Sequence, residues 1–396
     1  NAATDGFTGL GNEAITVSDT GSVAANTLTT IATANSSGTL NVSDAATITG
    51  TADQIIAAFA DSTITEASDV ALTVNSGTAS LTQARSLDGL TTGVVTATIA
   101  ATDLSDLVGS SPLLDANGNN AFTITIGTDD ATVSAADLNT LDGLTTVAIN
   151  AGNVTTITSS SLADINTLYA SSGFSGLGDQ AITANDSGSI AASTITTVAT
   201  ANSSGTLNVS DAATITGTAA EIIAAFADGT VTEASDVALT VNSGTATLAQ
   251  ARTLDGLTTG VVTATIADTV VSDLLGSSPL LDANSNNAFT ITIGTADAEI
   301  TAANLTSLNG LTTVAIDATN VTQITGTVAA ANDVYTAGDN GEISGLGNET
   351  VVISGESSNT LSDASTLNTL DGNTTGTVNA GSLTTIQGAL SALLTA

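Results

Sequence analysis

Residues 135–158 read AADLNTLDGLTTVAINAGNVTTIT, and the spacing of the apolar residues in this stretch decides the fold. The spacing is three residues through the first part, two residues around Ile149, and three again towards the end; the apolar positions are Leu138, Leu141, Leu144, Val147, Ile149, Ala151, Val154 and Ile157. Steps of three or four favour a helix, whereas steps of two favour a half-buried strand. The stretch therefore predicts a short helix that turns directly into a strand.

Relatives of this stretch recur along the whole chain. They are anchored at residues 31, 87, 141, 198, 254, 308 and 370, which defines subunits of about 55 residues. Three subunits make a longer repeat of 167 residues: Ala32 to Ala52 reappears unchanged as Ala199 to Ala219. We expect a first long repeat over residues 1–172, a second over residues 173–342 and a partial third over residues 343–396.

Each subunit contains alternating β-branched strand patterns and short amphipathic helices. The strand candidates are Ile15 and Val17; Leu40 and Val42; Val70, Leu72 and Val74; Phe122, Ile124 and Ile126; and Val147 and Ile149. Thr51 to Gln54, repeated as Thr218 to Glu221, predicts a helix that starts with a capping box. We interpret the Asp-Gly pairs, such as Asp142-Gly143, as helix ends in which glycine supplies a left-handed residue.

These patterns predict an α/β solenoid in which coils of about 28 residues stack their strands in parallel. The apolar spacing of residues 138–157 resembles that of leucine-rich repeats, with Ala151 where that family places its asparagine. The resemblance lies in spacing and not in residue identity. The alternative architecture is a string of separate α/β or β-sandwich modules of about 55 or 167 residues.

Composition removes most classes of function. The chain has 396 residues, a formal charge of -36, and no His, Cys, Met or Trp. Such a polyanion cannot neutralise phosphates, which excludes nucleic-acid binding, and it lacks the usual catalytic bases, thiol nucleophiles and zinc ligands. No apolar run reaches the length of a membrane helix, so we expect no membrane insertion. We also expect no enzyme activity, because no pair of carboxylates is singled out for acid–base chemistry.

Several phrases resemble those of a known kind of protein: AADLNTLDGLTTVAINAGNVTTIT, SGTASLTQARSLDGLTTGVVTATIA and NSSGTLNVSDAATITGTA. They are similar to sequences in the giant Ala/Thr/Asp-rich, adhesin-like cell-surface proteins of marine cyanobacteria, and the likeness covers essentially the whole chain. The resemblance implies an extracellular array in an envelope layer, adhesin or fibre. The glycine-aspartate nonapeptide of calcium-binding secreted toxins does not occur, so the calcium site of that family is not implied.

Two polar loops are the candidate metal sites. They begin like a calcium-binding EF-hand loop, with oxygen-bearing side chains at alternate positions: Asp115, Asn117 and Asn119 in the first repeat, and Asp282, Asn284 and Asn286 in the second. The loops lack the glycine and the final glutamate of that motif, and a polar turn is the alternative interpretation. Ca²⁺ is the only cofactor that these residues suggest.

Threonines at alternate positions offer a remote alternative. Thr96, Thr98, Thr123 and Thr125, with their copies in the second repeat, would form an ice-binding ladder if neighbouring coils aligned them on one exposed face. High strand propensity explains the same threonines more simply.

The sequence therefore predicts a structural protein of an extracellular filament, sheath or surface layer, which assembles by stacking acidic solenoid units. A calcium-dependent adhesin or binding module is the alternative. Self-association is the expected interaction, and cell-surface or polysaccharide contacts remain open. The apolar residues near the end of the chain should be covered by further chain or by a neighbouring subunit: Leu383, Ile386, Leu390, Leu393 and Leu394.

Overall fold

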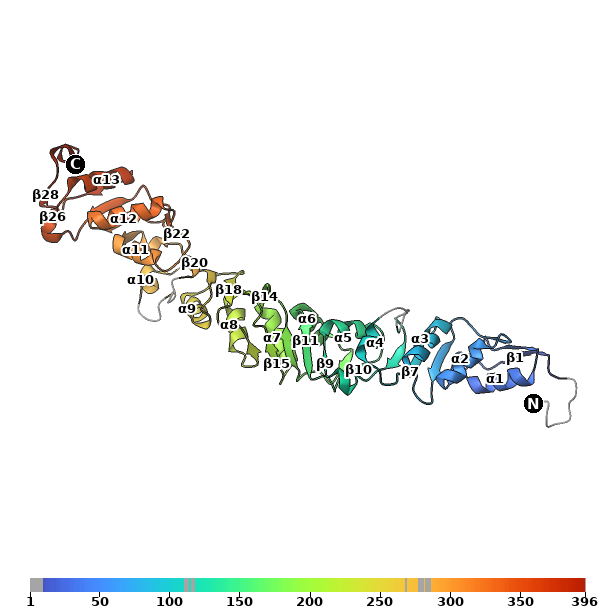
Figure 1. Ribbon diagram of the computed structural model, residues 1–396. Helices are drawn as coiled ribbons and strands as arrows, with labels where there is room; N and C mark the ends of the chain where they lie inside the picture. The colour runs from blue at the N-terminus through green and yellow to red at the C-terminus, as the bar shows by residue number, and fades with distance from the viewer. Residues whose placement is uncertain are drawn as a thin grey trace. The chain divides into compact units, whose positions relative to one another are not determined.

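The computed structural model describes residues 10–109, 114, 118–267, 269–276, 281 and 286–395. In these residues, short helices alternate with short strands that pair in parallel, so the fold is α/β, as the sequence predicts (Figure 1). The chain forms two compact units, Asn1–Asn185 with Thr197–Asn208, and Asp186–Thr196 with Val209–Ala396. The boundaries of the long repeats, at residues 172 and 342, remain a prediction from the sequence.

The first unit contains the following elements: β1 (Ala14–Thr16), β2 (Ser22–Ala24), α1 (Ala25–Ala34), β3 (Thr39–Asn41), β4 (Thr47–Gly50), α2 (Ala52–Ala60), β5 (Ile64–Thr65), β6 (Ala71–Val74), α3 (Leu81–Leu90), β7 (Val95–Thr98), α4 (Leu104–Val108), β8 (Ala121–Thr123), η1 (Thr128–Asp130), β9 (Thr132–Val133), α5 (Ala135–Asp142), β10 (Ile149–Asn150), β11 (Thr156–Ser160), α6 (Leu162–Ala170), β12 (Phe174–Ser175), β13 (Ala181–Ala184) and β15 (Thr206–Asn208). Helix α7 (Ala192–Ala201) has residues in both units.

The second unit repeats this order: β14 (Ser189–Ala191), β16 (Thr214–Gly217), α8 (Ala219–Ala227), β17 (Val231–Thr232), β18 (Ala238–Val241), α9 (Leu248–Leu257), β19 (Val262–Thr265), α10 (Val271–Leu274), β20 (Ala288–Thr290), η2 (Thr295–Asp297), β21 (Glu299–Thr301), α11 (Ala302–Asn309), β22 (Ile316–Asp317), β23 (Gln323–Gly326), α12 (Val328–Asp339), β24 (Ile343–Ser344), β25 (Thr350–Ile353), η3 (Ser357–Asn359), β26 (Thr360–Leu361), α13 (Ala364–Asn373), β27 (Val378–Asn379), β28 (Thr385–Ile386) and α14 (Leu390–Leu393).

A coil is the segment of chain that runs from one strand to the next strand in the same sheet. Equivalent strands of successive coils pair in parallel. In the first unit β2, β4, β6, β7 and β8 form one sheet in this order, while β1, β3 and β5 form another. Thr47 of β4 pairs with Ala71 of β6, so this coil takes 24 residues. The strands from β1 to β6 come as two short strands before each helix, where the sequence predicts one, whereas β7 is the single strand between α3 and α4. The second strand starts after a tight corner at which Asn41 Oδ1 accepts from Ser43 N (2.9 Å) and Val42 O accepts from Ala45 N (3.1 Å).

Capping boxes start α2 and α8, as predicted, and they also start α3 and α9. In α2, Thr51 Oγ1 accepts from Gln54 N at 3.2 Å, and Gln54 Oε1 accepts from Thr51 N at 3.0 Å. In α8, Thr218 and Glu221 repeat both bonds. Each box satisfies two amide groups that the first turn of a helix otherwise leaves without a partner.

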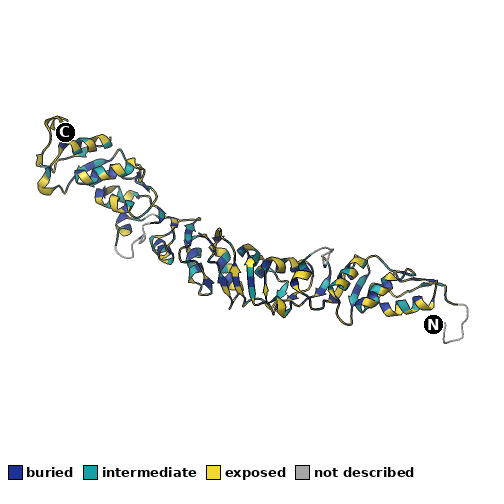
Figure 2. Cartoon of the chain, in the orientation of Figure 1, coloured by how far each residue is buried: buried dark blue, intermediate teal, exposed yellow. Residues whose placement is uncertain are grey.

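The core consists mainly of small and medium apolar residues on the helices and strands, and Figure 2 shows the buried residues in dark blue. Of the apolar positions in residues 138–157, all but one are buried, from Leu138 to Ile157. The exception is Val147, which lies on the segment between α5 and β10 and is 36% exposed. The spacing of three residues continues up to Val147 and therefore predicts a buried side chain there. In the structure Val147 lies after α5 has ended and before β10 begins, so neither element turns it towards the core.

Equivalent residues of the two long repeats have equivalent surroundings. Phe122 and Phe289 are completely buried, and each aligns with an alanine of the preceding strand, Ala97 and Ala264. Phe59 and Phe226 are both half-buried. The duplicated sequence therefore builds the same local structure twice.

Candidate functional site

The predicted calcium loops lie mostly outside the described residues. This holds for Asp115, Asn117, Asp282 and Asn284. Asn119 and Asn286 are described, and each donates its side-chain amide to a backbone carbonyl of the preceding coil, Thr92 O at 3.2 Å and Thr259 O at 3.1 Å. These two asparagines therefore act as links between coils, and a calcium site in the loops remains a prediction. No group of three acidic side chains within the described ranges is arranged to hold a metal ion.

The next residue along, Asn120, anchors a buried polar pair that sequence reasoning missed. Its Nδ2 donates to Asp88 Oδ1 at 2.7 Å, and its Oδ1 accepts from Val95 N at 2.7 Å. Asn120 is completely buried and Asp88 is 8% exposed. Asn287 and Asp255 repeat the 2.7 Å bond in the second unit. The signal for this pair was present in the exact repetition of Asp88 and Asn120 at the 167-residue offset.

The backbone angles of the glycines correct the interpretation of the Asp-Gly pairs. Gly143, after α5, has φ -71° and ψ -8°, which are right-handed values. Gly310 follows Asn309 at the equivalent place after α11, and its φ of -73° and ψ of -6° are also right-handed. In the pair Asp88-Gly89, the glycine lies inside α3. The prediction of a left-handed glycine was therefore wrong, and it is the aspartate that matters: Asp88 binds Asn120, and Asp142 Oδ2 accepts from Ser171 Oγ at 2.7 Å.

The threonines of the proposed ladder align only in part. Thr98 lies beside Thr123, but Thr96 lies beside Ala121 on one side and Thr73 on the other. The second unit repeats this register at Thr265 and Thr290. Between β7 and β8 the aligned threonines therefore form a single column.

Each of the two tyrosines of the chain belongs to a cluster of polar side chains. In the first unit the Tyr169 hydroxyl, on α6, lies 2.9 Å from Gln180 Oε1 and 2.8 Å from Asn202 Oδ1, and it shares its one hydrogen between these two acceptors. Gln180 Oε1 also accepts from Gly178 N at 2.7 Å, and Gln180 N donates to Asn202 Oδ1 at 3.0 Å. Burial raises the pKa of the Tyr169 hydroxyl, which therefore stays a hydrogen-bond donor at neutral pH.

Tyr335 occupies the equivalent place in the second unit. From α12 it donates to Glu349 Oε2 at 3.0 Å, and the same carboxylate oxygen accepts from Gly347 N at 2.9 Å. Gly178 and Gly347 have φ values of 137° and 125°, which favour glycine at the turn before the acceptor. A usable sequence signal existed, because both tyrosines of the chain precede a Ser-Gly-Leu-Gly segment.

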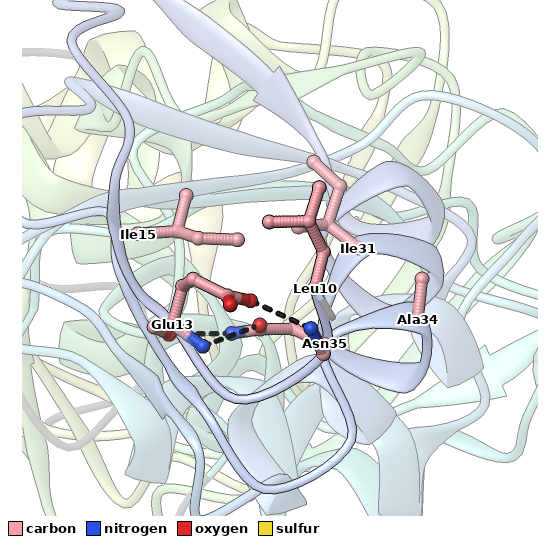
Figure 3. Close-up of a pocket in the computed structure, with 7 residues that line it drawn as sticks. Leu10, Glu13, Ile15, Ile31, Ala34 and Asn35 are labelled. Carbon is pink, nitrogen blue, oxygen red and sulfur yellow. Dashed lines mark hydrogen bonds between the residues drawn. The ribbon is translucent and has the colours of Figure 1, made fainter. Parts of the chain in front are cut away.

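A third version of this cluster lies near residue 10 and forms a pocket (Figure 3). Gly11 N donates to Glu13 Oε2 at 2.6 Å, Glu13 N donates to Asn35 Oδ1 at 3.0 Å, and Asn35 Nδ2 donates to Glu13 O at 2.7 Å. The cavity measures about 220 Å³ and is lined by Leu10, Gly11, Glu13, Ile15, Ile31, Ala34 and Asn35. In Figure 3, Leu10, Ile15 and Ile31 lie on one side of the bonded pair Glu13 and Asn35.

The described C-terminal region also presents apolar side chains to solvent. Leu390 is 75% exposed, Leu394 is 77% exposed and Leu393 is 40% exposed. The apolar residues from Leu383 to Leu394 are nearly helically spaced in the sequence, but they do not form one helix. Ile386 belongs to β28, and α14 contains only Leu390–Leu393. A cavity of about 280 Å³ lies beside Leu367, Val378 and Ile386. That further chain or a neighbouring subunit covers these leucines stays a prediction.

Within the part of the chain that the structure describes, no helix combines the length and apolar character that crossing a membrane requires. The chain matches no model of a known protein family and no curated protein.

Proposed function

We propose that this chain is a structural protein of an extracellular filament, sheath or surface layer, in which acidic α/β solenoid units associate end to end. Parallel pairing of successive coils in each unit supports the solenoid, because each coil presents strand edges and apolar side chains to the next. An array of this kind has an open cross-section at each end unless a polar cap covers it.

The observation that carries the proposal is the exposure of apolar side chains near residues 10 and 390, compared with equivalents elsewhere in the chain. Leu10 is 53% exposed and Ile15 is half-buried, whereas Ile182, the equivalent of Ile15 in the second long repeat, is 1% exposed. Leu390 and Leu394 are 75% and 77% exposed. Burial of such side chains stabilises an association by about 25 cal/mol for each Å² removed from water.

The charge of the chain sets the conditions for association. A formal charge of -36 makes units repel each other over about a Debye length, roughly 8–10 Å at moderate salt. Saline or calcium-containing surroundings shorten that range and neutralise part of the charge. An extracellular location, self-association and a contribution from Ca²⁺ therefore belong to the same proposal.

Negative-stain electron microscopy tests the proposal. Purified protein is imaged at moderate salt, with and without millimolar Ca²⁺ at matched ionic strength. We expect linear end-to-end particles, and longer ones with Ca²⁺. Single particles of one chain length in both conditions would contradict the assembly function.

A further inference from the structure

Glu342 stands at a place in the second unit where the first unit has no room for a side chain. In the first unit Gly173 O accepts from Ile149 N at 2.8 Å, and in the second unit Glu342 O accepts from Ile316 N at 3.0 Å. Gly173 and Glu342 are therefore equivalent. A methyl group added at Gly173 would collide with the Asp142 carboxylate, whereas Glu342 extends a whole side chain from the same place.

A longer helix makes this difference. The tyrosine-bearing helix α12 has 12 residues, whereas its equivalent α6 has 9. Gly341 N donates to Gly338 O at 2.9 Å, and Gly341 has a φ of 79°. Glu342 N donates to Ala337 O at 2.9 Å, which completes a Schellman motif at the end of α12. This motif fixes the backbone of Glu342, and Asn309 Nδ2, on the neighbouring α11, donates to Glu342 Oε2 at 2.8 Å.

A cavity of about 510 Å³ lies beside this bonded pair, and its lining is mainly polar. The polar side chains that line it are Asn309, Thr312, Thr313, Asn340 and Glu342. The hydroxyl hydrogens of both threonines are used inside the protein, because Thr312 Oγ1 donates to Phe289 O at 2.7 Å and Thr313 Oγ1 donates to Asn287 O at 3.0 Å. These hydroxyl oxygens can therefore only accept a hydrogen bond from a ligand.

The chemistry of the cavity favours a cation that donates hydrogen bonds. The Glu342 carboxylate accepts hydrogen bonds and donates none, and the formal charge of -36 attracts cations to the chain. Because Glu342 Oε2 is already bonded to Asn309, one carboxylate oxygen is left for a ligand. A guanidinium pairs best with both oxygens of a carboxylate, whereas an ammonium group is a compact charge with three donors. The cavity therefore fits a primary ammonium better than a guanidinium.

We propose that this cavity binds the primary ammonium group of a separate molecule, with Glu342 as the charged acceptor. The two basic residues of this sequence are Arg85 and Arg252, and it contains no lysine. No side chain of a second copy of this sequence can therefore supply the ammonium. The occupant is a lysine side chain of a partner protein or a free alkylamine. The inference goes beyond the proposed function, because association of identical copies does not use such a ligand.

Lysine blocked at both its α-amino and carboxyl groups, as Nα-acetyl-lysine amide, is the probe. Saturation-transfer NMR with the full chain at moderate salt measures its affinity, since salt screens the non-specific attraction between a polyanion and a cation. We expect saturable binding. The same molecule acetylated on Nε has lost its charge and should bind about tenfold more weakly, because a hydrogen bond between charged groups is lost.

Butylamine, which has the same charge and no peptide groups, distinguishes the two sources of an ammonium. Tighter binding of the lysine probe than of butylamine identifies a protein side chain as the occupant. Tighter binding of butylamine identifies a free alkylamine.

Glu342→Gln tests the charged acceptor. The side chain is exposed and keeps its size, so the fold should persist, and the affinity for the lysine probe should fall about tenfold. Glu299→Gln is the matched control: it removes the same charge from an exposed residue of β21 outside the cavity and should leave the affinity unchanged.

Three results would overturn the inference: equal binding of the two lysine probes, equal effects of the two variants, or no saturable binding of the amine. Association of the wild-type chain is measured separately, so failure of the probe leaves the proposed function standing.

Discussion

At the scale of single residues, the buried polar pair Asp88 and Asn120 contributes stability that apolar patterning does not reveal. Asn120→Ala removes the amide donor from a buried carboxylate and the acceptor from Val95 N. We expect a loss of about 3 kcal/mol in the free energy of unfolding, since both groups stay buried without this partner. Urea denaturation followed by circular dichroism measures it.

The adjacent Asn119→Ala is the matched control. It removes a bond to Thr92 O from a more exposed side chain, and we expect a loss below about 1 kcal/mol. Equal losses in the free energy of unfolding for the two variants would mean that the buried bond to Asp88 stabilises the chain no more than the bond to Thr92 O does.

Two carboxyl groups, Glu66 and Glu233, each contribute a pH dependence of definite sign to the stability of the chain. Burial, aided by repulsion from Asp61 and Asp228, raises the pKa of Glu66 and of Glu233. Since the folded chain then binds the proton more tightly than the unfolded chain, these groups make stability fall as pH rises from about 4.5 through their raised pKa values.

Replacing both glutamates by glutamine removes this loss of stability at higher pH, because glutamine does not ionise. The variant Glu66→Gln with Glu233→Gln should melt about 1–2 °C higher than the wild type at pH 7, and at the same temperature at pH 3.5. Differential scanning calorimetry at the two pH values tests this. A variant that melts lower at pH 7 would show that the carboxylates stabilise the fold.

At the scale of helices and strands, residue spacing and capping motifs predict much of the structure, and glycine identity predicts less. The capping boxes of α2 and α8 follow directly from Thr51 and Thr218. The second strand of a coil could not be predicted, because its start depends on a corner formed by side-chain and backbone bonds. The tyrosine clusters were missed because their partners lie 11 to 33 residues apart and meet only when coils stack.

Glycine substitutions test the helical assignment of the Asp-Gly pairs. Gly89 lies in α3 without a positive φ, and a methyl group added there meets no atom within 4 Å. Gly89→Ala should therefore stabilise the chain by about 0.5–1 kcal/mol, because alanine loses less backbone entropy. Thermal melting measures the change.

Gly93→Ala, four residues later, is the opposite case. Its added methyl group would collide with the backbone carbonyl of Asp69, so we expect destabilisation by more than about 1 kcal/mol. If Gly89→Ala also destabilised the chain, α3 would not continue through Gly89 in solution.

At the scale of the whole molecule, we propose that exposed apolar side chains, such as Leu10 and Leu390, make the chain associate. Duplication of the sequence predicts the repetition of structure, from the buried Phe122 and Phe289 to the paired Asp255 and Asn287. It does not predict which apolar side chains stay exposed, because their exposure depends on which other parts of the fold pack against them. That difference becomes visible in the exposure of Leu10 and Leu390.

Sedimentation velocity of the wild-type chain, beside the variant Leu390→Asp with Leu393→Asp, tests this claim most directly. The control is Val261→Asp, a substitution at a residue 41% exposed that lies on the segment between α9 and β19. We expect the wild type and the control to form larger species as concentration rises at moderate salt with Ca²⁺, and the double variant to sediment as a monomer. A wild-type chain that remains monomeric at high concentration in salt and Ca²⁺ would contradict the account.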